Sequence, residues 1–166
     1  APGILWLRFP LPFALDHVNL FALADGDGWT VVDTGFGDDS SKGVWLELLA
    51  GPLRARPIRR LVVTHFHPDH VGLAGWLQAR TGAELVMPET EWLVARYLVA
   101  EDPNAALATA MAFYRAAGVD AAQLDALEAD GHVYPRRITP PPTTFTPLVP
   151  GAALDIGGRR FEVLVG

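Results

Sequence analysis

The sequence predicts a single domain of the α/β class over residues 1–166. Three observations lead to this prediction. Short apolar runs with β-branched residues indicate strands, segments with a helical repeat of apolar residues alternate with them, and a cluster of polar side chains directly follows a buried run. In α/β proteins the functional groups gather in loops at the carboxyl ends of strands. We therefore expect the polar cluster, residues 64–72, to be the functional site.

The predicted strands are short runs bounded by Gly, Pro, Asp or Ser. Each run is apolar or alternating and carries β-branched or aromatic residues. They cover residues 4–9, 18–24, 29–33, 60–64, 85–87, 152–156 and 159–165. The turn residues 25–28 and 157–158 are rich in glycine and predict two hairpins. The run 60–64 is the buried strand that leads into the polar cluster.

Two helices are predicted between these strands. Their apolar faces are formed by Trp45, Leu48 and Leu49 in the first helix and by Leu73, Ala74 and Leu77 in the second. Ser40 or Ser41 is the expected N-cap of the first helix, which ends at Gly51. Gly82 ends the second helix.

Residues 88–131 predict a helical insertion on this core. The part 92–99 is apolar nearly all round, which predicts a helix buried on several sides or at an interface. Asp102 and Asp120 are the expected N-caps of two further helices. The insertion is expected to control access to the site, although packing between its helices explains its aromatic residues more simply. The proline-rich run 139–150 predicts a stiff, extended connector.

Composition excludes several classes of function. The chain has no cysteine, so disulfides, thiolate zinc sites and iron–sulfur clusters are excluded, and a metal must be held by nitrogen and oxygen. A net charge of -6 gives no global basic field for nucleic acid or anionic membrane. No apolar stretch approaches the roughly 20 residues of a membrane span. We expect a small-molecule substrate, a cytoplasmic location and no membrane partner, while a homo-oligomer remains open.

The polar cluster, THFHPDHVG at residues 64–72, concentrates metal-binding side chains. His65 and His67 are two residues apart, so on an extended backbone both imidazoles project to one side, as half of a tetrahedral zinc shell requires. Asp69 and His70 leave the turn at another angle and can serve a second ion about 3.5–4 Å away. The alternative interpretation is a set of histidines that cap a helix or decorate a surface turn.

The order and spacing of these residues resemble the metallo-β-lactamase fold superfamily. Residues 65–70 match its HxHxDH signature, residues 31–35 (VVDTG) are similar to its early VDTG motif, and residues 151–165 resemble the hairpin before its next metal-binding loop. The chain is more similar to the glyoxalase II-like and lactamase-beta-2-like hydrolases than to flavodiiron proteins. The resemblance implies an αβ/βα sandwich, of which this chain is the N-terminal half and the C-terminal half is missing.

The resemblance also implies roles for individual residues. His65 and His67 would bind one divalent ion, and Asp69 and His70 a second; imidazole at position 67 favours Zn2+ over iron. Asp69 would also orient the nucleophilic water and take up its proton. Asp33 would hydrogen-bond the histidine loop without touching the metal. A third histidine, a bridging aspartate and a final histidine would lie beyond the last residue.

Three functions agree with these residues. The first is zinc-dependent hydrolysis of a small ester, thioester or related substrate by a metal-bound hydroxide. The second is a metal-dependent nuclease or phosphodiesterase, against which the acidic balance weighs. The third is a non-catalytic metal-binding fragment, because two ligands for each ion make a weak site. His17 and His132, the remaining histidines, are expected to be surface or locally hydrogen-bonded residues.

Overall fold

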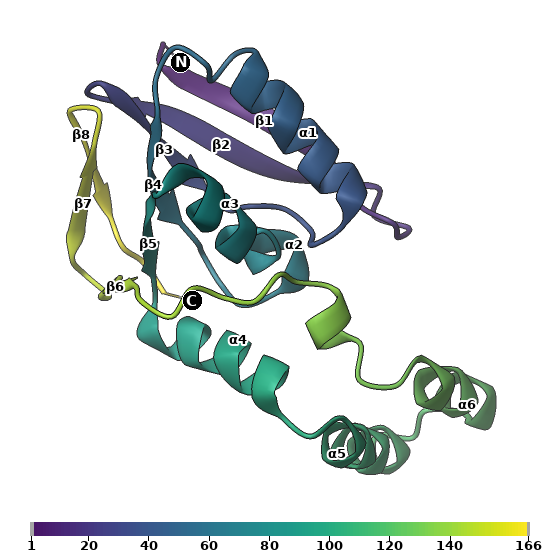
Figure 1. Cartoon of the computed structure of the whole chain (residues 1–166). Coiled ribbons are helices and arrows are strands. Elements are labelled where there is room, and N and C mark those ends of the chain that lie inside the picture. Colours follow the sequence, from purple (N-terminus) through teal and green to yellow (C-terminus); the bar gives the residue numbers. More distant parts are fainter. Residues whose placement is uncertain (1, 166) are drawn as a thin grey trace.

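The computed structural model describes residues 2–165, which form a six-stranded sheet, a separate hairpin and flanking helices (Figure 1). The sheet contains, in order from edge to edge, β1 (Ile4–Pro10), β2 (His17–Asp25), β3 (Gly28–Val32), β4 (Ile58–Val62), β5 (Glu84–Met87) and β6 (Thr146–Pro147). Strands β1 to β3 are antiparallel, and β3 to β6 are parallel. The hairpin contains β7 (Ala153–Ile156) and β8 (Arg159–Glu162). The predicted α/β class is confirmed.

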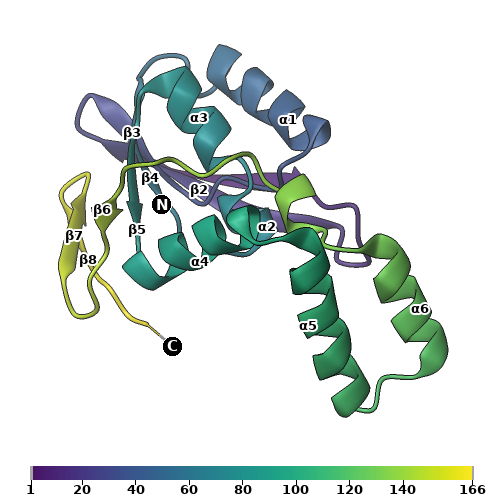
Figure 2. The same cartoon turned by 60° about the horizontal axis from the view of Figure 1, so that its bottom comes forward.

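The helices lie mainly on one face of this sheet. They are α1 (Asp39–Ala50), α2 (Pro68–Val71), α3 (Ala74–Thr81), α4 (Glu89–Ala100), α5 (Pro103–Ala116) and α6 (Ala121–Asp130), followed by the 3-10 turn η1 (Tyr134–Arg136). Helices α1 and α3 cover one face, while the β7–β8 hairpin lies on the other (Figure 1). Helices α5 and α6 extend away from the sheet (Figure 2). Within residues 2–165, every helix is too short or too polar to cross a membrane.

The core lies between the sheet and helices α1 and α3. Ala22, Val31, Leu61 and Leu85 are paired in register across β2, β3, β4 and β5, and all four are buried. They belong to one apolar cluster with the fully buried Trp45 of α1. Parallel strands at the centre of a sheet are covered by other elements, so their sequences are rich in apolar residues.

The opposite face of the sheet is only partly covered. Phe21, Val32, Val62 and Val86 form the next row in register, because side chains alternate along each strand. Val62 and Val86 are buried, but Phe21 is 40% exposed and its cross-strand partner Trp6 is 69% exposed. A cavity of ≈ 800 Å³ that is open to solvent lies between the hairpin and this face. Its apolar lining includes Leu23, Val32, Val62, Leu154, Ile156 and Phe161. The β1–β2 end of this face therefore presents apolar side chains to solvent.

Two helix predictions are corrected by the structure. The N-cap of α1 is Asp38 rather than Ser40 or Ser41: the Asp38 carboxylate accepts a hydrogen bond from the backbone N–H of Ser41 at 2.8 Å. The acceptor therefore comes from the residue just before the helix, as capping geometry requires. Helix α4, predicted to be buried on several sides or to lie at an interface, is not buried on several sides within the described part of this chain: it buries Ala95 and leaves Tyr97 60% exposed. The N-caps Asp102 and Asp120 and the helix stops Gly51 and Gly82 are confirmed.

Two strand predictions also change. Strand β4 ends at Val62, not at Thr64, because the Thr64 N–H donates to the Asp33 side chain instead of to a neighbouring strand. Strand β6 lies inside the run predicted to be a connector and pairs with β5 in parallel. This strand is two residues long and lies among prolines, so no alternation of apolar residues marks it in the sequence.

A strap formed by residues 137–142 crosses the segment that follows the histidine turn (residues 64–70). The backbone N–H and the hydroxyl of Thr139 both donate to the Gly72 carbonyl oxygen, at 2.7 and 2.8 Å. A Cβ atom at Gly75 would overlap the Pro140 carbonyl oxygen, and a Cβ at Gly72 would overlap the Pro68 carbonyl oxygen. Glycine at position 75 therefore allows the strap to pack against α3, and glycine at position 72 allows the chain to pass close to the backbone of the turn.

Replacing Gly75 by alanine is expected to destabilise the protein. The added methyl group must displace backbone of the strap, at a cost of about 1–3 kcal/mol. The matched control is Gly43→Ala in α1, where a Cβ meets no atom within 4 Å and the higher helix propensity adds up to about 1 kcal/mol. Urea unfolding of both variants measures the difference, and equal midpoints would contradict the close contact at Gly75.

Candidate functional site

The histidine turn, residues 64–70, begins where β3 and β4 end at the same edge of the sheet. The two strands are parallel, so the segments that follow them lie side by side. The Asp33 N–H donates to the Val62 carbonyl oxygen at 2.8 Å. Both the N–H and the hydroxyl of Thr34 donate to the His70 carbonyl oxygen, each at 2.8 Å, and Trp45 Nε1 donates to the Thr34 carbonyl oxygen. Backbone contacts therefore join the turn to the end of β3.

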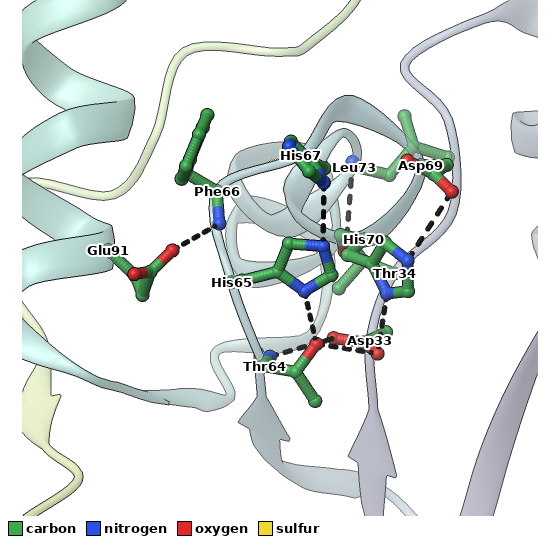
Figure 3. A network of polar contacts seen from close by, with 10 residues as sticks. All are labelled: Asp33, Thr34, Thr64, His65, Phe66, His67, Asp69, His70, Leu73 and Glu91. Atoms are coloured by element: carbon green, nitrogen blue, oxygen red, sulfur yellow. Dashed lines mark hydrogen bonds and ion pairs between the residues drawn. The ribbon is translucent and has the colours of Figure 1, made fainter. Parts of the chain in front are cut away.

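The Asp33 carboxylate is the central acceptor of the site (Figure 3). Its side chain is buried, and its backbone has φ 62°, a left-handed conformation that aspartate tolerates better than most residues. Oδ1 accepts hydrogen bonds from the Thr64 N–H at 2.8 Å and the Thr64 hydroxyl at 2.9 Å. Oδ2 accepts from His70 Nδ1 at 2.8 Å. Asp33 thus contacts both the start and the end of the histidine turn.

These contacts determine which nitrogen of two histidines carries a proton. A carboxylate only accepts, so His70 Nδ1 is the donor to Asp33, and its Nε2 keeps a lone pair. The Thr64 hydroxyl donates to Asp33 and lies 2.9 Å from His65 Nδ1. The hydroxyl therefore accepts from His65 Nδ1, which leaves a lone pair on His65 Nε2 as well.

The side chains predicted to bind metal form two pairs. His65 Nε2 lies 3.0 Å from His67 Nδ1, and Asp69 Oδ2 lies 3.3 Å from His70 Nε2 (Figure 3). Two nitrogen ligands of one tetrahedral zinc ion are about 3.3 Å apart, given Zn–N distances near 2.0–2.1 Å. The first pair has nearly this spacing. Within residues 2–165, no group of three or more His, Asp or Glu side chains is arranged to hold one ion.

The pKa values of two histidines are shifted in opposite directions. Burial lowers the pKa of His65, and the neighbouring His70 and His67 lower it further. Burial also acts to lower the pKa of His70, but the hydrogen bond and the charge of Asp33 outweigh it and raise this pKa. His65 is therefore held in the neutral form, which is the form that binds a metal. A cation that binds His70 Nε2 therefore competes with a proton for the lone pair of this nitrogen.

Residues on the other side of the turn hold its backbone. The Phe66 N–H donates to Glu91 Oε2 at 3.0 Å, and the Tyr134 hydroxyl donates to the Phe66 carbonyl oxygen at 2.6 Å. Burial, and to a lesser degree Glu91, raises the pKa of Tyr134, so its hydroxyl stays protonated. Thr64, Glu91 and Tyr134 were not predicted from the sequence. Thr64 lies directly before the signature, whereas Glu91 and Tyr134 are 25 and 68 residues from Phe66 and carry no local signal.

The two histidines outside the cluster lie elsewhere and bind locally. His17 Nδ1 is 2.5 Å from the Asp16 carboxylate and 3.0 Å from Arg8, at the start of β2. His132 Nε2 is 2.7 Å from the Leu98 carbonyl oxygen of α4. Both histidines have the structural use expected from the sequence.

Comparisons with known proteins find relatives of one kind. Residues 14–165 match the model of the family described as the Metallo-beta-lactamase superfamily. A beta-lactamase domain protein from Burkholderia ambifaria has 35% sequence identity and a TM-score of 0.81, over 98% of this chain and 46% of that one. A metallo-beta-lactamase family protein from Thermus thermophilus has 28% identity and a TM-score of 0.77, over 99% of this chain and 52% of that one. The probable metallo-hydrolase YqjP of Bacillus subtilis (strain 168) is 32% identical over 71 residues, which are 42% of this chain and 22% of that protein.

These matches agree with the fold. The chain spans about half the length of the two solved structures. The name of the matched family indicates proteins that act with a bound metal. The family match covers residues 14–165, which include the histidine turn and the strands from β2 onward, and the two structural matches cover 98% and 99% of the chain. The chain belongs to the metallo-beta-lactamase superfamily.

Proposed function

We propose that the complete protein is a zinc-dependent hydrolase of a small ester, thioester or related substrate. The observation that carries this proposal is the pairing of His65 Nε2 with His67 Nδ1 at 3.0 Å, while His65 Nδ1 is held by the Thr64 hydroxyl. Metal-binding histidines typically have one ring nitrogen hydrogen-bonded to the protein and the other directed at the metal. In His65, Nδ1 is the hydrogen-bonded nitrogen and Nε2 faces the second predicted ligand, His67. The name of one relative, the probable metallo-hydrolase YqjP, and the name of the matched family support the same reaction class.

Two divalent ions, most simply Zn2+, would be held by the two pairs of side chains. His65 and His67 would hold the first ion, and Asp69 and His70 the second. A bound divalent ion supplies Lewis-acid chemistry: it lowers the pKa of water and polarises a carbonyl or phosphoryl oxygen. Each pair is incomplete by itself, and the remaining ligands would come from a second half of the domain. The relatives, which are about twice as long, have room for such a half.

The side chains of this chain hold the site in one geometry. Asp33 orients His70 directly and His65 through Thr64, so both rings present Nε2 to the same region. The Asp69 side chain is 27% exposed, and its Oδ2 lies beside His70. A partly exposed carboxylate beside a bound water can accept a proton from it during hydrolysis. Asp69 is therefore the proposed general base.

Replacing His67 by alanine is expected to abolish tight zinc binding at the first site. Loss of a ligand should reduce affinity by more than the roughly 10–100-fold caused by loss of an outer hydrogen-bond partner. The controls are His17→Ala and His132→Ala, which remove histidines bonded locally outside the turn. Zinc content by mass spectrometry and chelator competition, in the complete protein, measure the difference.

The same proteins distinguish the proposed reaction from its alternatives. The substrates are a thioester, a lactone, a β-lactam and bis-p-nitrophenyl phosphate. Metal-dependent turnover of the thioester or lactone, lost in His67→Ala, supports the proposal. Turnover of the phosphodiester alone would indicate a nuclease instead. A wild-type protein that binds no zinc and turns over none of them would contradict both functions.

Replacing Thr64 by valine is expected to weaken zinc binding about 10–100-fold, because the hydroxyl that orients His65 is lost. Valine has nearly the shape of threonine, so the change removes mainly the hydrogen bonds. Thr64→Ser keeps the hydroxyl and should bind zinc nearly as tightly as the wild type. Equal zinc affinities of the valine and serine variants would show that the contact between Thr64 and His65 is not needed.

A further inference from the structure

Phe66, which separates His65 from His67, has both of its backbone polar groups bound by distant side chains. Phe66 lies outside any helix or strand, so no regular ladder holds its N–H or its carbonyl oxygen. Glu91 Oε2 accepts from the N–H at 3.0 Å, and the Tyr134 hydroxyl donates to the carbonyl oxygen at 2.6 Å. The peptide planes before and after Phe66 are therefore each fixed by one side chain.

The two side chains belong to one packed unit. Glu91 lies in the first turn of α4, Tyr134 begins η1, and these two elements contact each other. His132, just before η1, bonds the Leu98 carbonyl oxygen of α4 at 2.7 Å. The Tyr134 side chain is buried, and its ring centroid lies 6.3 Å from that of Phe66. Glu91 and Tyr134 therefore hold Phe66 from a common support.

This support lies opposite the Asp33 network. Figure 3 shows Glu91 reaching the Phe66 N–H from the side of α4, whereas Asp33 and Thr64 lie beside the histidine rings. The direction of each histidine side chain depends on the backbone at its own Cα. Rotation of either peptide plane at Phe66 would therefore move the imidazoles of His65 and His67 relative to each other.

We propose that Glu91 and Tyr134 are positioning residues that set the spacing of His65 and His67 for a metal ion by fixing the backbone of Phe66. This inference rests on the proposed function, since it assumes that the two histidines share an ion. Neither residue touches the metal or the substrate. The helical segment 88–131 and the turn after it thus support the metal site, in addition to any role in access.

A second explanation for Glu91 is its charge, because a carboxylate near a cation attracts it at longer range. The substitutions Glu91→Ala and Glu91→Gln separate the two explanations. Glutamine keeps a side-chain oxygen that accepts from the Phe66 N–H but removes the charge. Alanine removes both the acceptor and the charge.

The experiment measures zinc affinity by chelator competition in the complete protein with Glu91→Ala, Glu91→Gln or Tyr134→Phe. We expect affinity about 10–100-fold lower in Glu91→Ala and Tyr134→Phe, and near the wild-type value in Glu91→Gln. Hydrogen exchange of the Phe66 amide in the metal-free protein gives a second readout, which should be faster in Glu91→Ala only. The matched controls are Tyr97→Phe and Glu101→Ala, since Tyr97 and Glu101 form a similar 2.8 Å pair on α4 away from the turn.

Three outcomes would overturn the inference. Zinc affinities of Glu91→Ala and Tyr134→Phe equal to those of the control variants contradict a role in positioning, and so does a loss of affinity in Glu91→Gln as large as in Glu91→Ala. Unchanged exchange of the Phe66 amide in Glu91→Ala contradicts the contact itself. If Tyr134→Phe does not fold, the wild type and the two Glu91 variants still decide the question. Failure of the proposed function is recognised separately, because the wild-type protein would then bind no zinc.

Discussion

The hydrogen bonds accepted by the Asp33 carboxylate hold the site together. Asp33 is buried, and burial of a carboxylate is costly unless hydrogen bonds replace its hydration. Thr64 supplies two of these bonds and His70 supplies a third. The bonds join the segments after β3 and β4, end the pairing of β4 at Val62, and fix the proton positions on the histidines. The turn that carries the signature thus takes its shape from a side chain about thirty residues earlier.

Support from a second direction completes the geometry. Glu91 and Tyr134 bind the backbone of Phe66, and Thr139 of the strap binds the carbonyl oxygen of Gly72. The histidine turn has few backbone hydrogen bonds of its own, so each of these side chains replaces a bond that a regular element would supply. The sheet and the helical segment together hold a turn that neither could hold alone.

One face of the sheet is only partly covered within this chain. Trp6 and Phe21 are paired on β1 and β2 and are 69% and 40% exposed, although aromatic side chains of this size are usually buried. The solved relatives are about twice as long as this chain. That a second half of the sandwich packs on this face stays a prediction from the family resemblance.

The sequence by itself determined the elements and the candidate ligands, because both are encoded locally. Apolar periodicity identified every described strand except β6, together with the buried face of α3, and the spacing of two residues predicted that His65 and His67 lie on one side of the turn. Only the tertiary structure decided how the turn is held. The hydrogen bond between Thr64 and Asp33 links residues 31 positions apart, and the bond between Glu91 and Phe66 links residues 25 positions apart. No local sequence pattern predicts bonds over such separations. A side chain at such a distance finds its partner only after the sheet and the helices have packed.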